Sequence, residues 1–304
     1  MVFTPSPNVL GPRALPFAVT IHDAMPERLP AEFLERAGSL KRDFRRSAKL
    51  ASTILTDSEH SKNDLMEIYD LPAEKVKVVY LGYDRKRFNS SSPDRAAQAT
   101  LLARLGIRPP YIVHHGMVQL RKNLGRLVKA YKILLSRRPD MGIQLVLAGP
   151  LGKGSQQVRE LAGFVSRKGK VIFTGALEND DLALLVKGAS LCVIPSLYEG
   201  FCLPMVEAMA CGVPTIAANR TAIPEVSGVV LRYFDPLSEE EIAVTIQDVL
   251  DHSDLQRELA RAGLKRTAEF SWHRCAKETL AALTGTQAGA ANLVASCQSR
   301  IAST

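Results

Sequence analysis

The sequence predicts an α/β fold organised in two domains, each a parallel sheet with helices packed on it. Short apolar runs at 111–116, 143–148 and 191–194 are typical of buried parallel strands, and helical stretches separate them. The 304 residues are enough for two domains of ordinary size. Only three strands are expected before residue 100, so the first domain is predicted to be an incomplete sheet with an exposed edge.

Composition and charge narrow the functional class. An apolar content of 46% and a charged content of 23% are those of a soluble globular protein, and neither a run of membrane-spanning length nor a signal peptide is evident. The net charge of +8 suits anionic partners such as nucleotide diphosphates or an anionic membrane face. The sequence has no basic stripe with interleaved aromatic residues, so nucleic-acid binding is not expected. Five cysteines without metal-ligand spacing indicate a reducing compartment.

The first domain, with its linker, is expected to span residues 1–107. Residues 17–23, FAVTIHD, form an apolar strand that ends in His22 and Asp23. Such a pair could face a cleft or could belong to an ordinary surface turn. Strands are also expected at 53–56 and 76–80, and residues 85–107 are interpreted as a polar, helical linker.

Two helices are expected between these first strands. Ser58 or Ser61 caps the second of them, with Ser61-x-x-Asp64 as a variant of the capping box. The first, at 32–50, is basic, so it is either the solvated face of a packed helix or a surface that lies on an anionic membrane. Its basic residues are Lys41, Arg42, Arg45, Arg46 and Lys49.

The second domain is expected at 108–270. Its first strand leads into the segment GMVQLRKN at 116–123, a glycine turn that enters a helix. Arg121 and Lys122 there are suited to clamp a diphosphate, because arginine offers a bidentate fork and lysine a point charge. An exposed basic turn is the alternative. The later glycine loop at 149–154 lacks the spacing of a phosphate-binding loop and is interpreted as a surface turn that approaches the nucleotide.

The rest of the domain is organised around residues 195–214, PSLYEGFCLPMVEAMACGVP. They connect strand 191–194 to strand 215–218, and Pro204 marks the first turn of a helix from residue 203 to residue 210. The loop before this helix lies at the carboxyl edge of the sheet, where open α/β folds bind their ligands. Free N–H groups at the helix start would form an anion site.

Two acids frame that loop. Glu199 precedes the helix, and Glu207 lies about one turn inside it. Carboxylates near an anion site could hold the hydroxyls of a ribose or a sugar. Alternatively, Glu207 complements the helix dipole and Glu199 is a solvated loop residue.

This string resembles the signature of the retaining GT-B glycosyltransferases of family 4, often called glycosyl transferases group 1. Glu199 and Glu207 occupy the two positions of the family's E-x7-E pair, and 116–123 is similar to its G-x-x-x-x-R-K-N segment. Cys202 stands where the family usually has glycine, which is a cost if the backbone needs a positive φ. The resemblance covers roughly residues 16–283.

The resemblance implies a GT-B architecture, in which two Rossmann-like domains face a cleft and the N-terminal one is incomplete. The segment 271–304 would hold a closing helix, opened by Phe270-Ser-Trp272, that crosses back to the first domain; the tail from residue 284 would fray. Glu225, in a segment similar to the family's I-P-E-V, is expected to cap or brace its loop. The protein would be cytoplasmic, with peripheral contact at the inner face of the membrane left open.

The implied activity is transfer of a hexose from GDP-mannose or a UDP-hexose to a hydroxyl of a glycan or lipid-linked acceptor, with retention of configuration. No cofactor and no metal are expected, since two cations and a helix N-terminus would carry the charge of the diphosphate. The catalytic residues would be His22, Glu199, Arg121 and Lys122, with Asp23 as a weaker member. The donor-binding residues would be Gly116, Arg121, Lys122, Glu199, Gly200, Phe201, Cys202, Leu203 and Glu207.

The short first domain leaves other functions open. The chain could be a fragment, could have a misplaced start codon, or could have a reduced domain. A non-catalytic nucleotide-sugar-binding module or an inactive fragment is therefore the main alternative. An epimerase or phosphorylase on the same architecture fits less well, because the string around Glu199 and Glu207 resembles the transferases more closely.

Overall fold

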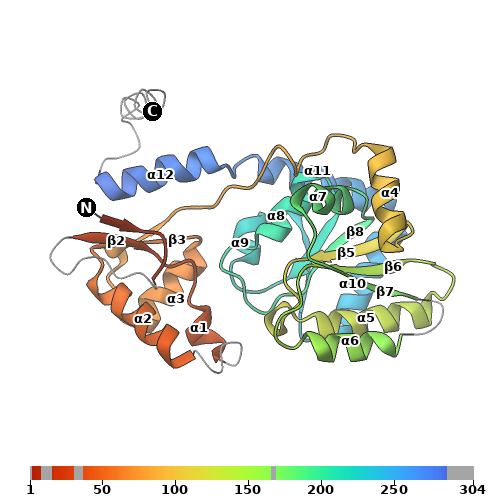
Figure 1. Cartoon of the computed structure of the whole chain (residues 1–304), viewed down its shortest axis with the longest axis horizontal. Helices are drawn as coiled ribbons and strands as arrows, with labels where there is room; N and C mark the ends of the chain where they lie inside the picture. Colours follow the sequence, from red (N-terminus) through yellow and green to blue (C-terminus); the bar gives the residue numbers. More distant parts are fainter. Residues whose placement is uncertain (1, 8–15, 31–36, 166–168, 286–304) are drawn as a thin grey trace.

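The computed structural model describes residues 2–7, 16–30, 37–165 and 169–285, and it has two parallel sheets, each with helices between its strands (Figure 1). This confirms the predicted α/β class. The expected tail after residue 284 lies almost entirely outside the described residues, as does the start of the expected helix at 32–50. Within the described ranges, no helix is both long enough and apolar enough to cross a bilayer.

The smaller sheet has the strand order β1-β2-β3-β4, with all neighbours parallel. Its strands are β1 (Val2–Thr4), β2 (Phe17–Thr20), β3 (Thr53–Thr56) and β4 (Val76–Val78). The prediction of three strands before residue 100 was therefore wrong by one. Strand β1 has only three residues, too few to show a periodicity, and it is recognisable only through its pairing with β2, from Val2 to Phe17.

The helices of this unit cover the sheet and close a small apolar core. They are α1 (Met25–Arg28), α2 (Ala37–Leu50), α3 (Glu59–Tyr69) and the 3₁₀ turn η2 (Ala73–Lys75). Ser58 is the N-cap of α3, because its hydroxyl accepts a hydrogen bond from Ser61 N at 3.1 Å. The expected capping box from Ser61 to Asp64 is wrong, since both residues lie inside the helix.

The larger sheet has the order β10-β9-β8-β5-β6-β7. Its strands are β5 (Tyr111–His115), β6 (Gln144–Ala148), β7 (Val171–Gly175), β8 (Leu191–Ile194), β9 (Thr215–Ala218) and β10 (Arg232–Phe234). The chain first builds outward from β5 to β7 and then returns to place β8 on the other side of β5. The strand order therefore reverses between β5 and β8, which is where such sheets bind ligands.

Helices lie on both faces of the larger sheet (Figure 1). They are α4 (Arg95–Leu105), α5 (Leu124–Arg137), α6 (Ser155–Gly163), α7 (Asn179–Lys187), α8 (Leu203–Ala210), α9 (Ile223–Ser227), α10 (Glu239–Asp251) and α11 (Ser253–Thr267), with 3₁₀ turns η3 (Leu120–Lys122) and η4 (Gly228–Val230). Helix α4, in the segment expected to be a linker, buries Leu101 and Leu102 in this core. Strand β10 is short, and η4 lies just before it.

The last helix, α12 (Trp272–Thr284), returns to the smaller unit and packs near β3 (Figure 1). It is capped by Ser271, whose hydroxyl accepts a hydrogen bond from Arg274 N at 3.1 Å. Its start lies so close to Gly82 that a Cβ there would be 2.1 Å from Trp272 N. The helix expected to cross back to the first unit corresponds to α12, which contacts β3 of the smaller unit.

Candidate active site

The loops that follow β5 and β8 meet at the switch point of the larger sheet. Gly116 directly follows β5 and has φ of 123°, and a Cβ there would lie 3.7 Å from Pro204 Cγ and 3.9 Å from Lys122 Nζ. Gly149, after β6, is held even closer, since its Cβ would fall 2.1 Å from Gly116 O. The first turn of α8, Lys122 and two glycines thus form one compact group.

Glu199 connects the two cations of the segment 116–123. Arg121 Nη1 donates to its Oε2 at 2.8 Å, and Lys122 Nζ donates to its Oε1 at 2.6 Å. Lys122 and Glu199 are both buried. Burial would raise the pKa of Glu199, but the charges of Lys122 and Arg121 outweigh it and lower the pKa to about 2. The convergence expected for Arg121, Lys122 and the first acid is therefore present.

The cluster of these three side chains keeps donors for a further anion. Arg121 and Lys122 against one carboxylate leave one net positive charge. Arg121 Nη1 also donates to Tyr198 O at 3.1 Å, and the Gln119 amide, with its oxygen toward Arg121, accepts from Nε at 2.9 Å and Nη2 at 3.2 Å. Lys122 has three N–H donors, of which Glu199 takes one. A phosphate could be bound without breaking the cluster.

Helix α8 starts from a residue in the left-handed region. Cys202, its N-cap, has φ of 76° and ψ of 63°, which is the positive φ that makes glycine favourable at this position. Burial, followed by the Glu199 charge, raises the pKa of the Cys202 thiol to about 12. A thiol with so high a pKa is not a nucleophile near neutral pH.

Phe201, one of the predicted donor-binding residues, belongs to an aromatic cluster. Its ring is buried and packs edge-on to Phe270, with centroids 5.3 Å apart, and 6.1 Å from the Tyr80 ring. These three rings join the loop before α8 to the segment that precedes α12. The ring of Phe201 is therefore committed to this aromatic cluster, and its contact with the donor stays a prediction.

The smaller unit reaches the same loop through His22 and Asp23. A Cβ on Gly200 would lie 2.8 Å from Asp23 Cβ and 3.1 Å from His22 O, so only glycine fits against this pair. Asp23 is largely buried, its Oδ1 accepts from Met25 N at 2.9 Å, and burial raises its pKa. The strand end expected to face a cleft is therefore beside the loop that carries Glu199.

The His22 imidazole is held by an acid that the sequence reasoning missed. His22 Nδ1 lies 2.8 Å from Asp57 Oδ2, and the His22 side chain is 56% exposed while that of Asp57 is 7% exposed. The hydrogen bond to Asp57 raises the pKa of His22, and burial raises the pKa of Asp57, so the pair holds its proton more firmly than either group would alone. Asp57 directly follows β3, the neighbour of β2. This position at a strand end was the feature of the sequence that could have indicated its contact with His22.

The second acid, Glu207, also has a partner that was not predicted. His115, the last residue of β5, places Nε2 at 3.0 Å from Glu207 Oε2. The side chains are 2% and 19% exposed, respectively. The feature of the sequence that could have indicated this partner is the pair His114-His115 at the carboxyl end of a strand. The two neighbours point to opposite faces, and His114 Nδ1 binds Val193 O instead, at 2.9 Å.

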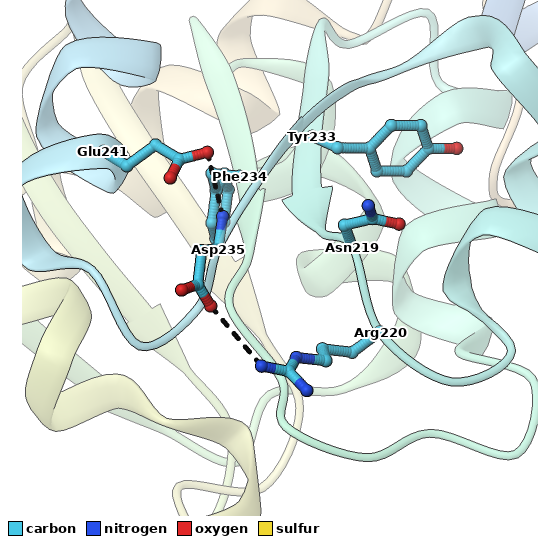
Figure 2. Close-up of a pocket in the computed structure, with 6 residues that line it drawn as sticks. All are labelled: Asn219, Arg220, Tyr233, Phe234, Asp235 and Glu241. Atoms are coloured by element: carbon cyan, nitrogen blue, oxygen red, sulfur yellow. Dashed lines mark hydrogen bonds and ion pairs between the residues drawn. The ribbon is translucent and has the colours of Figure 1, made fainter.

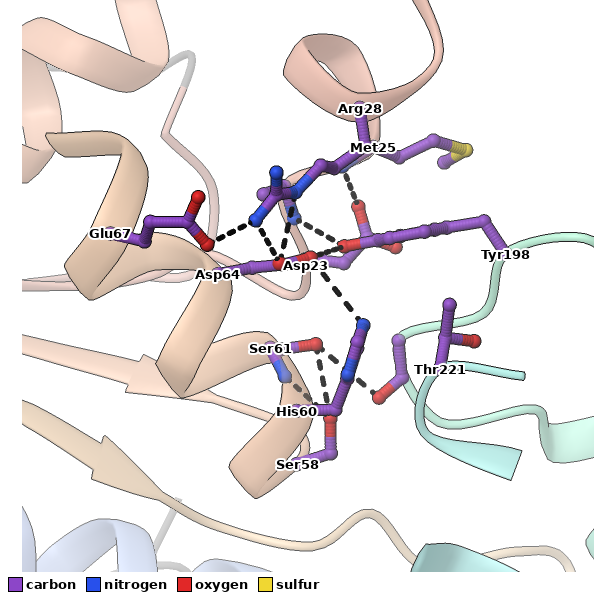
Figure 3. Close-up of polar contacts among 12 residues, drawn as sticks. Asp23, Met25, Arg28, Ser58, His60, Ser61, Asp64, Glu67, Tyr198 and Thr221 are labelled. Atoms are coloured by element: carbon purple, nitrogen blue, oxygen red, sulfur yellow. Dashed lines mark hydrogen bonds and ion pairs between the residues drawn. The ribbon is translucent and has the colours of Figure 1, made fainter. Parts of the chain in front are cut away.

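Tyr198 ties the two units together (Figure 3). Its hydroxyl donates to Asp64 Oδ2 at 2.7 Å and accepts from Ala24 N at 3.3 Å. Asp64 also binds Arg28, whose Nε lies 2.9 Å from Oδ1. Since Tyr198 precedes Glu199, these contacts place the smaller unit against the candidate site.

A second tie comes from Glu225, which was expected to cap or brace its own loop. Its carboxylate instead accepts from the first-turn amides Glu59 N at 2.7 Å and His60 N at 2.9 Å, and from Tyr80 Oη at 2.9 Å. It therefore caps a helix of the other unit.

A separate pocket of about 320 Å³ lies at the ends of β9 and β10 (Figure 2). It is lined by Asn219, Arg220, Tyr233, Phe234, Asp235 and Glu241. Arg220 and Asp235 form an ion pair at 3.6 Å, and both are half exposed. None of the predicted site residues line this pocket. Among the described residues, no group of three or more His, Cys, Asp and Glu side chains is arranged to hold a metal ion.

Comparison with known proteins places these features in a family. The family model Glycosyl transferases group 1 matches residues 101–266, and the model Glycosyltransferase Family 4 matches residues 2–87. The O-antigen chain mannosyltransferase B of Escherichia coli is 32% identical over 282 residues, which are 90% of this chain and 72% of that protein. The D-inositol 3-phosphate glycosyltransferase of Salinispora tropica is 33% identical over 246 residues, 76% of this chain and half of that protein.

The fold has solved counterparts. The structure of Anabaena Alr3699/HepE in complex with UDP matches with a TM-score of 0.72 and 22% identity, over 90% of this chain and 73% of that one. At this identity the likeness shows the fold, two Rossmann-like units of GT-B type. With the matches of both family models and the similarity to the Escherichia coli protein, the chain belongs to the Glycosyl transferases group 1 family of GT-B glycosyltransferases.

Proposed function

We propose that this chain transfers a hexose, with retention of anomeric configuration and without a metal ion, from a nucleotide diphosphate sugar to a hydroxyl of a glycan or lipid-linked acceptor. The observation that carries the proposal is the convergence of Arg121 and Lys122 on Glu199 beside the N-terminus of α8. The name of the Escherichia coli relative favours mannose as the sugar. GDP-mannose is therefore the first donor to test, followed by UDP-hexoses.

The leaving diphosphate is the group whose charge must be stabilised. Arg121, Lys122 and the free N–H groups from Leu203 onward carry that charge, and they are already in place before the reaction. Preorganised donors of this kind need no rearrangement as the charge develops. They would do the work that a metal ion does in other transferases.

The remaining side chains bind hydroxyls. Glu199 accepts from the hexose, Glu207 from the ribose, and His22 contacts the sugar from the opposite wall. Glu199 is a poor covalent nucleophile, because two cations hold its pKa at about 2. Retention then follows from attack on the same face: the bond from the sugar C1 to the diphosphate breaks, the acceptor oxygen bonds to C1, and its proton passes to the departing phosphate.

Two substitutions test this function. Lys122→Ala should abolish transfer, and Glu207→Ala should weaken binding of UDP or GDP by about 10-fold or more, the value of a hydrogen bond to a charged group. Calorimetric titration and a transfer assay with GDP-mannose measure both effects. Lys129→Ala is the matched control, since Lys129 is a half-exposed lysine paired with Glu239 away from the site.

The assay also separates the proposal from its rival. Unchanged affinity and turnover in both Lys122→Ala and Glu207→Ala would reject the site. Firm nucleotide binding by the wild-type chain, without hydrolysis or transfer from any donor tried, would favour a non-catalytic nucleotide-sugar-binding module.

We also infer peripheral contact with an anionic membrane through helix α2. Its exposed cations are Arg42, Arg45, Arg46 and Lys49. Clustered cations near a surface attract anionic lipids, and this attraction is screened by salt. The chain should sediment with anionic phospholipid vesicles at low salt and be released at high salt, whereas binding to neutral vesicles alone would contradict the inference.

A further inference from the structure

The carboxylate of Glu207 is hydrogen-bonded to a residue of the larger sheet. His115 ends the central strand β5, and its Nε2 lies 3.0 Å from Glu207 Oε2, across the contact between β5 and the first turns of α8. The side chain of His115 is 2% exposed and that of Glu207 is 19% exposed. The Oε2 atom of Glu207 is therefore bound to a buried histidine, while part of the carboxylate remains accessible from the candidate site.

The direction of this hydrogen bond follows from the chemistry of the two groups. An ionised carboxylate only accepts, so Nε2 carries the proton and donates it. His115 Nδ1 is buried and has no hydrogen-bond partner among the described residues. Glu207 Oε1 likewise has no protein partner in the described part of the chain. The ring is therefore oriented by Glu207 and by its packing, and it leaves Oε1 free to accept from a ligand.

A glutamate on a helix surface has several rotamers, and only some would place its carboxylate over the loop before α8. A ring fixed on a buried strand selects one of them. A hydrogen bond from a residue behind the ligand-binding side chain orients the group that touches the ligand. His115 is suited to this role because the strand, rather than a flexible loop, supports it.

His114 provides an internal comparison. It is as buried as its neighbour, and its Nε2 also has no hydrogen-bond partner within the described ranges, yet its Nδ1 binds the backbone at Val193 O. Burial, with the nearby Lys122 charge, lowers its pKa to about 3, so it is neutral. Adjacent strand residues face opposite sides. Only the His115 side chain meets Glu207.

We propose that His115 is a positioning residue, which fixes the Glu207 carboxylate so that Oε1 accepts from the ribose hydroxyls of a bound nucleoside diphosphate. This inference rests on the proposed function, and it specifies how the carboxylate of Glu207 is held in position for the ligand. It predicts that removing the imidazole donor weakens recognition of the ribose hydroxyls and leaves the contribution of the diphosphate and base in place.

The experiment compares ribose-containing and ribose-deficient nucleotides. UDP and GDP are titrated calorimetrically into the wild-type chain, and the one that binds more tightly is compared with its 2′,3′-dideoxy form. The ratio of the two affinities measures the hydroxyl contacts. The variants are His115→Phe, which keeps a ring without a donor, and His115→Gln, whose amide reaches the position of Nε2. His114→Phe is the control for disturbing an equally buried histidine.

The wild-type chain should prefer the ribonucleotide by about 10-fold or more. His115→Phe should reduce this ratio to about 3-fold or less, His115→Gln should largely restore it, and His114→Phe should leave it as in the wild type. A purely structural role would weaken both nucleotides equally. A wild-type ratio in His115→Phe would overturn the positioning role.

A second pair of variants keeps the test decisive if His115→Phe does not fold. His115→Asn and His115→Gln are both polar, but the shorter amide of asparagine falls short of the Nε2 position. Equal ratios in these two variants would reject the inference. If neither UDP nor GDP bound the wild-type chain, the proposed function itself would fail and this inference with it. Binding with an unaltered hydroxyl preference in all His115 variants would reject the positioning role alone.

Discussion

Lys122 Nζ lies 2.6 Å from Glu199 Oε1, so the cation assigned to the diphosphate is already paired with the acid assigned to the sugar. Arg121 binds the other oxygen of the same carboxylate at 2.8 Å. The pairing keeps two cations together in a buried place, where each alone would be costly. It also reduces the net charge of the three side chains to one positive charge.

This pairing predicts opposite effects of one substitution on binding and on turnover. Glu199→Gln removes the negative charge that competes with a phosphate for Arg121 and Lys122. Free UDP or GDP should therefore bind about 3- to 10-fold more tightly, while transfer should fall by about 100-fold or more because the acceptor for the sugar hydroxyl is lost. Calorimetry and a transfer assay measure the two quantities.

The same variant should lower the free energy of unfolding by about 3 kcal/mol or more, because a buried ion pair loses one partner. Glu239→Gln is the control, since Glu239 pairs with Lys129 at the surface. Weaker nucleotide binding by Glu199→Gln would show that the carboxylate supports phosphate binding instead of opposing it.

The His22–Asp57 pair predicts a titration change. Asp57→Asn replaces the carboxylate that raises the pKa of His22 with a neutral amide, so this pKa should fall, and the shift is measurable by NMR of the imidazole protons. A raised pKa in the folded chain gives stability that is full below the pKa of an unfolded histidine, about 6.5, and is lost as the pH rises through the folded value. The variant should lose this pH dependence. An unchanged His22 titration would mean that Asp57 does not hold the ring in solution.

The backbone conformation of Cys202 predicts that glycine is more stable than alanine at this position, which is the reverse of the usual order. At φ of 76° a Cβ costs about 1–2 kcal/mol, so Cys202→Gly should be more stable than Cys202→Ala by about 1 kcal/mol. Cys211 is the matched control, because it is also buried but has φ of −76°. There the alanine variant should be the more stable by about 0.5–1 kcal/mol. Chemical denaturation measures both pairs, and the same order at both positions would contradict the argument.

The larger sheet and its loops could be predicted because their signals are local. Glycines, prolines and apolar runs fix where strands end, and in a parallel sheet these ends meet at one edge. Arg121 and Glu199 therefore had to come close, although they are far apart in the sequence. The positive φ of Cys202 was raised only as a condition, because this residue stands where the family that the sequence resembles usually has glycine.

The partners of the site were harder to predict because they depend on which strands are neighbours. Asp57 meets His22 only because β2 pairs with β3, and the sequence does not state that pairing. His115 lies in an apolar run, so its sequence context is that of a core residue. Only the packing of α8 on the sheet shows its contact with Glu207. Ser61 and Asp64 matched a capping pattern, but in the structure Asp64 accepts a hydrogen bond from Tyr198 of the other unit. Local patterns cannot reveal contacts of that kind.

Glu225 predicts that the two units stay in contact in solution. Its carboxylate accepts from Glu59 N and His60 N, so it satisfies first-turn amides of α3 that would otherwise need water. Glu225→Ala should increase the hydrogen-exchange rates of these two amides by about 5-fold, corresponding to a lost cap of about 1 kcal/mol, while Ser58 continues to hold Ser61 N.

Glu67→Ala is the control for this measurement, because Glu67 lies on the same helix but is exposed and pairs with Arg28. If the units swing apart most of the time, the Glu225 cap is rarely formed, and its removal would leave the exchange of both amides unchanged. Faster exchange in Glu225→Ala alone would instead show a closed arrangement, in which Tyr198 and Glu225 hold His22 against the loop of Glu199. Addition of a nucleotide that binds the larger unit should then change the exchange at these amides little, because closure precedes binding.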